Sequence, residues 1–200
     1  MRAADGARSA ETLGRERSGS GVVIGPDGLI LTIGYLLLEA DTVEVTTQDN
    51  KTLPARPVAY DLATGFGLLR PLLPLRGVAP VPLGSLKDAA TGDALMAATG
   101  GEDGDVAMTQ LVSKRPFSGY WEYHIEAALF TSPPIGNHSG APLFNQRGEL
   151  VGIGSLFVTD ALGRDAPRTA GNMFVPIDLL APILPELMAR GSSQQSHRAW

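Results

Sequence analysis

The chain has 200 residues, 44% of them hydrophobic, with no cysteine and a formal net charge of -5. This length supports one domain with a sizeable core. The negative charge and the scattered Lys and Arg residues argue against a nucleic-acid binder, because phosphate recognition needs clustered positive charge. No apolar run approaches the roughly 18 residues of a membrane-spanning helix. The lack of cysteine excludes a disulfide framework and thiolate metal sites.

The N-terminal segment is polar and mixed in charge. Residues 1–17 contain no apolar stretch of the kind that a signal peptide requires. We therefore assign them to an N-terminal extension that precedes the folded domain and find no signal peptide in this chain.

Short strand-like runs separated by Gly, Pro and Asp fill the first half of the chain, as is typical of a β-sandwich or barrel. Gly25-Pro26-Asp27-Gly28 has the residues of a tight turn and predicts a hairpin. The expected strands are 21–24, 29–32, 42–47, a segment through 58–60, and 66–69. Residues 71–92 are rich in Pro and Gly and predict the connection between two halves.

The second half repeats this pattern and ends in a helix. Its expected strands are 94–99, 106–113, 120–130, 142–145, 149–158 and 172–175. A helix is expected over about 178–190, with Asp178 as its N-cap and Gly191 as its stop, and with first turns made irregular by Pro182 and Pro185. Residues 192–200 have the polar composition of a linker.

One loop carries the strongest chemical signal. Its sequence, Asn137-His138-Ser139-Gly140-Ala141-Pro142-Leu143, resembles the nucleophile loop of the chymotrypsin-like serine proteases. The resemblance implies that Ser139 is the nucleophile position. It also implies that the backbone N–H groups of Asn137 and Ser139 form the oxyanion hole.

Further segments, in the same order along the chain, resemble the HtrA-type (Deg-like) bacterial members of this trypsin-like family. They are Ser18-Gly19-Ser20-Gly21 with the strand after it, Gly28-Leu29-Ile30-Leu31-Thr32, Asp61-Leu62-Ala63-Thr64-Gly65, Gly148-Glu149-Leu150-Val151-Gly152-Ile153 and Asn172-Met173-Phe174-Val175-Pro176-Ile177. The resemblance implies an all-β fold of two six-stranded antiparallel β-barrels with the active site between them and a short C-terminal helix. The domain would cover residues 18–191, with the first barrel over about 18–75 and the second over about 92–176.

Two of the three catalytic side chains of that family are absent. Tyr35 stands at the position of the catalytic His, and Gly65 stands at the position of the Asp that orients it. A phenol with an ordinary pKa of about 10 keeps its proton at neutral pH and is a poor general base. Only Ser139 remains, as a vestigial nucleophile.

Three functions follow as hypotheses. The first is a catalytically inactive pseudoprotease that binds a peptide or protein as a scaffold, with the peptide added as a strand beside Ile153, Gly154 and Ser155. The second is an active serine endopeptidase in which His138 or His124 serves Ser139 as a non-standard base. The third is a cleft recruited to bind a metal or a small ligand. We expect no cofactor, and no His pair has the spacing of a metal site.

The resemblance also implies partners and a location. It predicts a peptide or protein ligand, an exported, periplasmic protein and a homo-oligomer. In the natural protein we expect a peptide-binding PDZ domain to follow the linker at 192–200.

Overall fold

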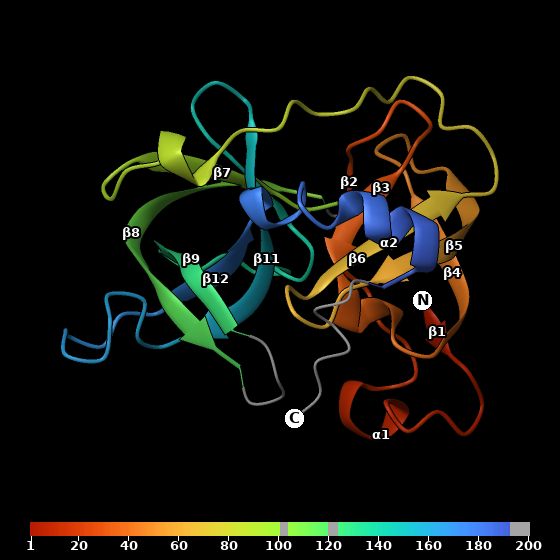
Figure 1. The fold of residues 1–200 in the computed structure, drawn as a ribbon, viewed down its shortest axis with the longest axis horizontal. Helices are drawn as coiled ribbons and strands as arrows, with labels where there is room; N and C mark the ends of the chain where they lie inside the picture. The colour runs from red at the N-terminus through yellow and green to blue at the C-terminus, as the bar shows by residue number, and fades with distance from the viewer. Residues whose placement is uncertain (101–103, 120–123, 193–200) are drawn as a thin grey trace.

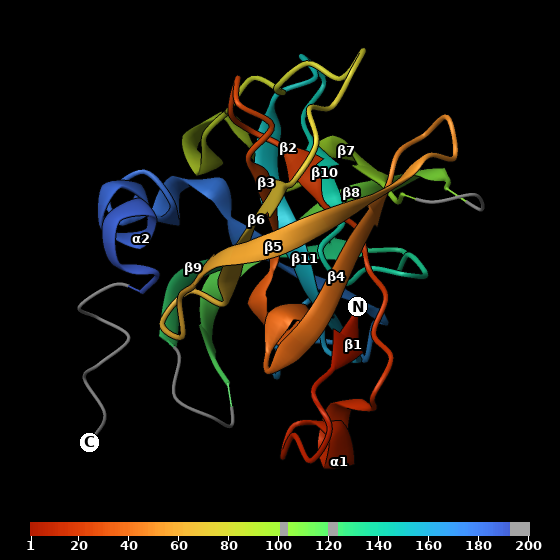
Figure 2. The same cartoon turned by 90° about the vertical axis from the view of Figure 1, so that its right-hand side faces the viewer.

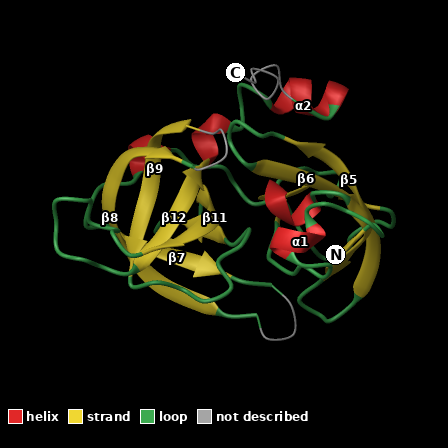
Figure 3. Cartoon of the chain, turned by 90° about the horizontal axis from the view of Figure 1, so that it is seen from below, coloured by secondary structure: helices red, strands yellow, loops and turns green. Residues whose placement is uncertain are grey.

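A computed structural model describes residues 1–100, 104–119 and 124–192. Two β-rich bodies lie side by side, with one C-terminal helix on the outside of the first (Figure 1, Figure 3). Each body holds six antiparallel strands. The expected fold class, two six-stranded antiparallel β-bodies of the double-barrel type with a short C-terminal helix, is therefore confirmed, with the second body a closed barrel and the first a six-stranded sheet.

The first body is a six-stranded sheet in the order β1-β4-β5-β6-β3-β2. The long strands β4 and β5 of this sheet lie at the front of the view in Figure 2. The turn at residues 25–28 closes as expected, because the Gly28 N–H donates to the Gly25 carbonyl oxygen at 3.0 Å and β2 pairs with β3. The strands are β1 (Arg2–Ala3), β2 (Val22–Val23), β3 (Ile30–Ile33), β4 (Ala40–Thr46), β5 (Thr52–Tyr60) and β6 (Phe66–Pro71).

The second body is a closed barrel in the order β10-β11-β12-β9-β8-β7. Its strands lie close to the expected ranges, except that β8 extends well past residue 113. Residues 120–123, the start of one expected strand, lie outside the described residues. The strands are β7 (Ala94–Ala98), β8 (Val106–Ser118), β9 (His124–Ser132), β10 (Pro142–Phe144), β11 (Leu150–Val158) and β12 (Gly171–Pro176).

The N-terminal segment is part of the first body, which corrects its assignment as an extension outside the fold. β1 pairs with β4, and without it the region from 18 to 75 holds only five strands. Arg17 is 7% exposed and fastens this segment. Its guanidinium donates to the carbonyl oxygens of Tyr35 and Leu38 at 3.2 and 2.7 Å and to the Ser9 hydroxyl at 2.7 Å.

The helices are short. The expected helix over 178–190 is wrong at its start, because a 3-10 turn and an irregular stretch precede α2. Pro182 and Pro185 explain the delay, since a proline cannot donate the N–H that a helix interior requires. Gly191 ends α2 in the left-handed conformation, as expected. Helices are α1 (Ala10–Leu13), η1 (Gly34–Leu37), η2 (Leu86–Asp88), η3 (Ile177–Leu179) and α2 (Leu184–Arg190). Within the described part of the chain, no helix is long and apolar enough to cross a membrane.

Three clusters of buried side chains hold the fold together. One fills the first body, a second fills the closed barrel, and the largest joins the two bodies and the C-terminal helix. The largest cluster includes Leu31, Phe66, Phe130, Ile153 and Leu187. Each such buried side chain contributes about 1.5–3 kcal/mol through removal of apolar surface from water. This shared core fixes the position of one body against the other, and with it the site between them.

We expect Arg17→Ala to lower the free energy of unfolding by about 2 to 4 kcal/mol, because it leaves the carbonyl oxygens of Tyr35 and Leu38 without their charged donor. Urea denaturation measures the change. Arg15→Ala is the matched control, since the Arg15 side chain is mostly exposed and its ion pair with Asp5 is worth less than about 1 kcal/mol. Equal effects of the two substitutions would contradict the role of Arg17.

Candidate active site

The loop that carries Ser139 lies between the two bodies and is fixed from both sides. The Ser20 N–H donates to the Ser139 carbonyl oxygen at 2.8 Å, and the Gly140 N–H donates to the Gly154 carbonyl oxygen at 2.9 Å. Gly140 has φ +75°, and a Cβ there would overlap the Ser20 carbonyl and the Thr32 hydroxyl. A glycine is therefore required for the loop to reach the first body.

Tyr35 and Ser139 meet at this point, although they are 104 positions apart in the chain. The Tyr35 hydroxyl is hydrogen-bonded to the Ser139 hydroxyl. It also donates to the Ser155 carbonyl oxygen at 3.3 Å. Because a phenol carries one proton, this donation leaves the Ser139 hydroxyl as the donor to Tyr35.

Ser20 connects three segments around the loop, a role that the motif analysis did not give it. Its carbonyl oxygen accepts from the Thr32 hydroxyl at 2.6 Å, and its hydroxyl accepts from the Gly100 N–H at 2.9 Å. Ser20 is buried, so these bonds are shielded from water. Ser20 lies in the segment 18–21, which resembles the HtrA-type proteases, but the sequence alone does not show that it holds the Ser139 loop. The hydrogen bond from the Ser20 N–H to the Ser139 carbonyl oxygen shows this role.

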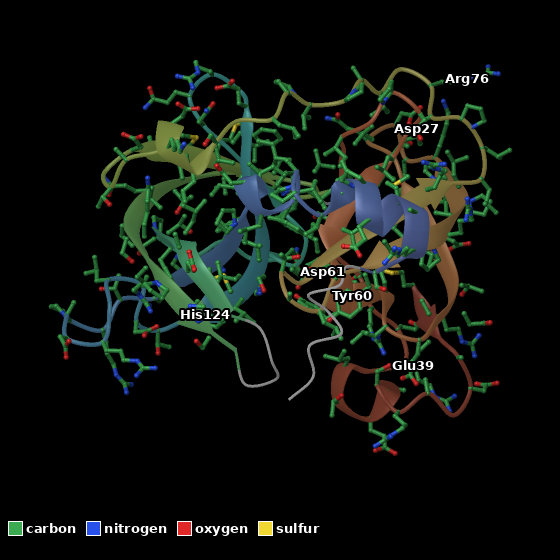
Figure 4. The ribbon with its side chains drawn as sticks, viewed as in Figure 1. Asp27, Glu39, Tyr60, Asp61, Arg76 and His124 are labelled. Carbon is green, nitrogen blue, oxygen red and sulfur yellow. The ribbon has the colours of Figure 1, made fainter. Side chains whose placement is uncertain are left out.

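Gly65 bonds to Gly34, the residue before Tyr35, through its backbone. Its carbonyl oxygen accepts from the Gly34 N–H at 2.6 Å, and its φ of +80° is left-handed. The Tyr60 ring covers Gly34 so closely that a Cβ on Gly34 would overlap it. Figure 4 shows Tyr60 and its neighbour Asp61 together on the first body. The buried Asp61 carboxylate accepts from the N–H and the hydroxyl of Thr64 at 2.8 and 2.6 Å, which stabilises the turn before Gly65.

Asn137 and Ser139 are the two positions predicted to form an oxyanion hole. Asn137 adopts a left-handed conformation, with φ 51°, which asparagine tolerates better than most residues. Within the described ranges, the N–H groups of Asn137 and Ser139 donate to no acceptor. The loop thus holds two backbone N–H groups that have no acceptor in the described part of the chain.

Neither His138 nor His124 is hydrogen-bonded to the Ser139 hydroxyl. His138 is half-buried, and burial lowers the pKa of its imidazole below the ordinary value. His124 pairs with the Ser118 hydroxyl at 2.8 Å and is exposed, on the second body in Figure 4. Among the described residues, no His nitrogen is hydrogen-bonded to Ser139; His197 lies outside them.

The peptide-binding edge of β11 was predicted at Ile153, Gly154 and Ser155, but among the described strands the edge that faces β10 is unpaired only from Ser155 onward. Ile153 pairs with Pro142 on one side and Val175 on the other, and Gly154 bonds to Gly140 and Ala141. These two residues have no edge left for a peptide, which corrects their assignment as peptide-binding. A bulge between Gly154 and Leu156 turns the Ser155 carbonyl out toward Tyr35.

Beyond the bulge, no described strand pairs with residues 155–158 on the side of β10. β12 covers the opposite edge of these residues. Phe157 is 54% exposed there, an unusual environment for a large apolar side chain.

A pocket of about 180 Å³ lies beside Asn137. It is lined by Ala97, Thr99, Asp105, Ala107, Ile135, Gly136 and Asn137. No group of three or more His, Asp or Glu side chains in the described part of the chain could hold a metal ion.

The fold and the nucleophile loop define the class of protein. The model of the trypsin-like peptidase domain matches residues 19–153, more than half of the chain, and the chain belongs to that family. Its relatives are HtrA-type proteases. A probable periplasmic serine endoprotease described as DegP-like, from Pseudomonas savastanoi pv. phaseolicola, is 30% identical over 194 residues. The serine endoprotease DegS of Haemophilus influenzae is 29% identical over 182 residues.

These alignments cover 94% and 86% of this chain but only 38% and 51% of the two relatives, so the chain spans about half their length or less. The fold is also that of the HtrA-type protease AlgW solved with a decapeptide, with a TM-score of 0.73 at 21% identity. That match covers 87% of this chain and 52% of AlgW.

We expect the free energy of unfolding to decrease as the pH is lowered, and part of this decrease to depend on His138. Burial lowers the pKa of its imidazole in the folded chain, so the unfolded chain binds the proton more readily. Stability is therefore retained above the ordinary histidine pKa of about 6.5 and is lost as the pH falls below it. The loss between pH 7.5 and 5.5, measured by urea denaturation, should be smaller in His138→Gln than in the unaltered protein. Identical losses would count against this reading.

Proposed function

We propose that this chain is a non-catalytic member of the trypsin-like peptidase family that binds extended peptide segments. The observation that carries the proposal is the chain of hydrogen bonds from the Ser139 hydroxyl to Tyr35 and from Tyr35 to the Ser155 carbonyl oxygen. A serine nucleophile must give its proton to a base. Here the relay ends on an amide carbonyl, which accepts a hydrogen bond but does not take up a proton at neutral pH.

The loss of a base lowers the catalytic rate of a serine protease by a large factor. In the serine protease subtilisin, removing the base lowers the catalytic rate by about a millionfold, even with the nucleophile in place. The backbone N–H groups of Asn137 and Ser139 would leave only the small catalysis that an oxyanion hole provides alone.

The surroundings of Tyr35 also support a non-catalytic role. Gly65 has a left-handed backbone, with φ 80°, which glycine adopts without strain, and it offers no carboxylate. The Tyr60 ring fills the space beside Gly34, the residue before Tyr35. The backbone that precedes Tyr35 is thus held by a bond between two glycines, Gly34 and Gly65, and neither glycine offers a carboxylate to a base at position 35.

Peptide binding is supported by the open edge of β11 and does not need the missing side chains. An extended peptide can pair with residues 155–158 through main-chain hydrogen bonds. The exposed Phe157 supplies apolar contact on that edge. AlgW, which shares the fold, has been solved with a decapeptide and with a tripeptide.

We place this function in the periplasm. The support is the description of the DegP-like relatives from Pseudomonas savastanoi pv. phaseolicola and Ectopseudomonas mendocina as periplasmic. A protein without cysteine needs no redox protection in such an oxidising compartment.

We expect no serine-dependent peptidase activity. Casein turnover by the unaltered protein should equal that of Ser139→Ala, and a fluorophosphonate probe should leave Ser139 unlabelled, because both reactions need an activated hydroxyl. Ser118→Ala, which removes a hydroxyl on β8, controls for the loss of a serine. Labelling or turnover that disappears only in Ser139→Ala would establish an active endopeptidase and refute the proposal.

Restoring the histidine should not restore activity. Tyr35→His supplies an imidazole, but Gly65 still offers no carboxylate to fix its tautomer. In trypsin, replacing that carboxylate by an amide already lowers the rate about ten-thousandfold. Casein turnover by Tyr35→His should therefore remain at the level of Ser139→Ala. A gain of a hundredfold or more would show that the chain retains a working scaffold for catalysis.

A further inference from the structure

The nucleophile loop presents donors that suit a negatively charged oxygen. Among the described residues, the N–H groups of Asn137 and Ser139 have no acceptor, whereas those of Gly140 and Ala141 are bonded to Gly154 and His138. Asn137 and Gly140 are both left-handed, with φ 51° and 75°. His138 and Ser139 between them do not have a positive φ, so the backbone alternates between left-handed and other conformations. Such alternation can direct successive N–H groups into a concavity that attracts anions.

Two hydroxyl groups lie beside these amides. Ser139 and Tyr35 are hydrogen-bonded to each other, and a hydroxyl proton can rotate toward a better acceptor. An imidazole at position 35 would be an acceptor toward Ser139, but a phenol can donate. Tyr35, which is a poor base, therefore adds a hydroxyl donor to the site.

The open edge of β11 leads a peptide to this place. A strand added antiparallel to β11 runs from the Val158 end toward Ser155. The Ser155 carbonyl oxygen and the Ser139 hydroxyl both contact the Tyr35 hydroxyl, so they are one hydroxyl apart. A peptide whose last N–H donates to Ser155 consequently brings its C-terminal carboxylate to Ser139.

We propose that the disabled site captures the free C-terminal carboxylate of a peptide. The last peptide N–H donates to the Ser155 carbonyl and displaces Tyr35 from it. The carboxylate then accepts from the N–H groups of Asn137 and Ser139 and from the hydroxyls of Ser139 and Tyr35. This inference rests on the proposed function, the addition of a peptide strand to β11, and specifies its ligand as a peptide that ends at the site.

The test uses one peptide in two forms, fluorescein-Gly-Ala-Val-Ala-Val with a free carboxylate and the same peptide with a C-terminal amide. Fluorescence anisotropy with the whole chain measures both affinities. The free acid should bind about tenfold or more tightly, because hydrogen bonds to a charged acceptor are roughly twice as strong as neutral ones. Equal binding of the two forms would overturn the inference, while absence of binding by either would overturn the proposed function on which it rests.

Variants separate the carboxylate contacts from general damage. Tyr35→Phe and Ser139→Ala should each reduce the preference for the free acid to about threefold or less, because each removes one donor. Tyr35→Phe should bind the amide form at least as well as the unaltered protein, because it leaves the Ser155 carbonyl to the peptide. Ser118→Ala, whose hydroxyl pairs with His124, should retain the full preference. A preference that survives both Tyr35→Phe and Ser139→Ala would refute the assignment, and so would an equal weakening of both peptides by either variant.

Discussion

The hydrogen bond from the Ser20 N–H to the Ser139 carbonyl oxygen joins the two bodies at the point where the site is assembled. The Thr32 hydroxyl and the Gly100 N–H bond to the same serine, so three segments hold it in place. Gly140 permits this approach, because a Cβ there would overlap the Ser20 carbonyl. Every other feature of the site depends on this contact, since it sets the distance between Ser139 on the second body and Tyr35 on the first.

The fold does not require the catalytic side chains, because they contribute chemistry and little packing. The core that joins the two bodies consists of buried apolar residues such as Leu31, Phe130 and Ile153. Tyr35 packs against that core only in part. Residues other than a base and its carboxylate partner can therefore stand beside Ser139 without disturbing the loop or the strand edge. This separation of scaffold from chemistry allows a protease fold to serve as a binding module.

Much of the architecture follows from local pattern. Alternating apolar residues and the turn at residues 25–28 were enough to predict most strands. The predictions that were wrong concern long-range or competing interactions. β1 is two residues long and forms only because β4 lies beside it. α2 starts late because Pro182 and Pro185 prevent a helix from beginning at the predicted N-cap, Asp178. The open edge on β11 begins at Ser155 because the pairing with β10 ends at Ile153 and the serine loop bonds only to Gly154, and no periodicity in the sequence marks this end.

The sequence by itself determined that a serine loop of the trypsin-like type is present, because a continuous motif is a matter of residue identity. From the neighbouring motifs it also predicts that Tyr35 and Gly65 stand at the positions of the catalytic His and Asp. Only the tertiary structure decided where the Tyr35 hydroxyl goes. It bonds to Ser139 and Ser155, which are 104 and 120 positions away in the chain. Contacts of that separation depend on how two packed bodies meet, and local sequence pattern carries no information about a hydrogen bond formed across such an interface.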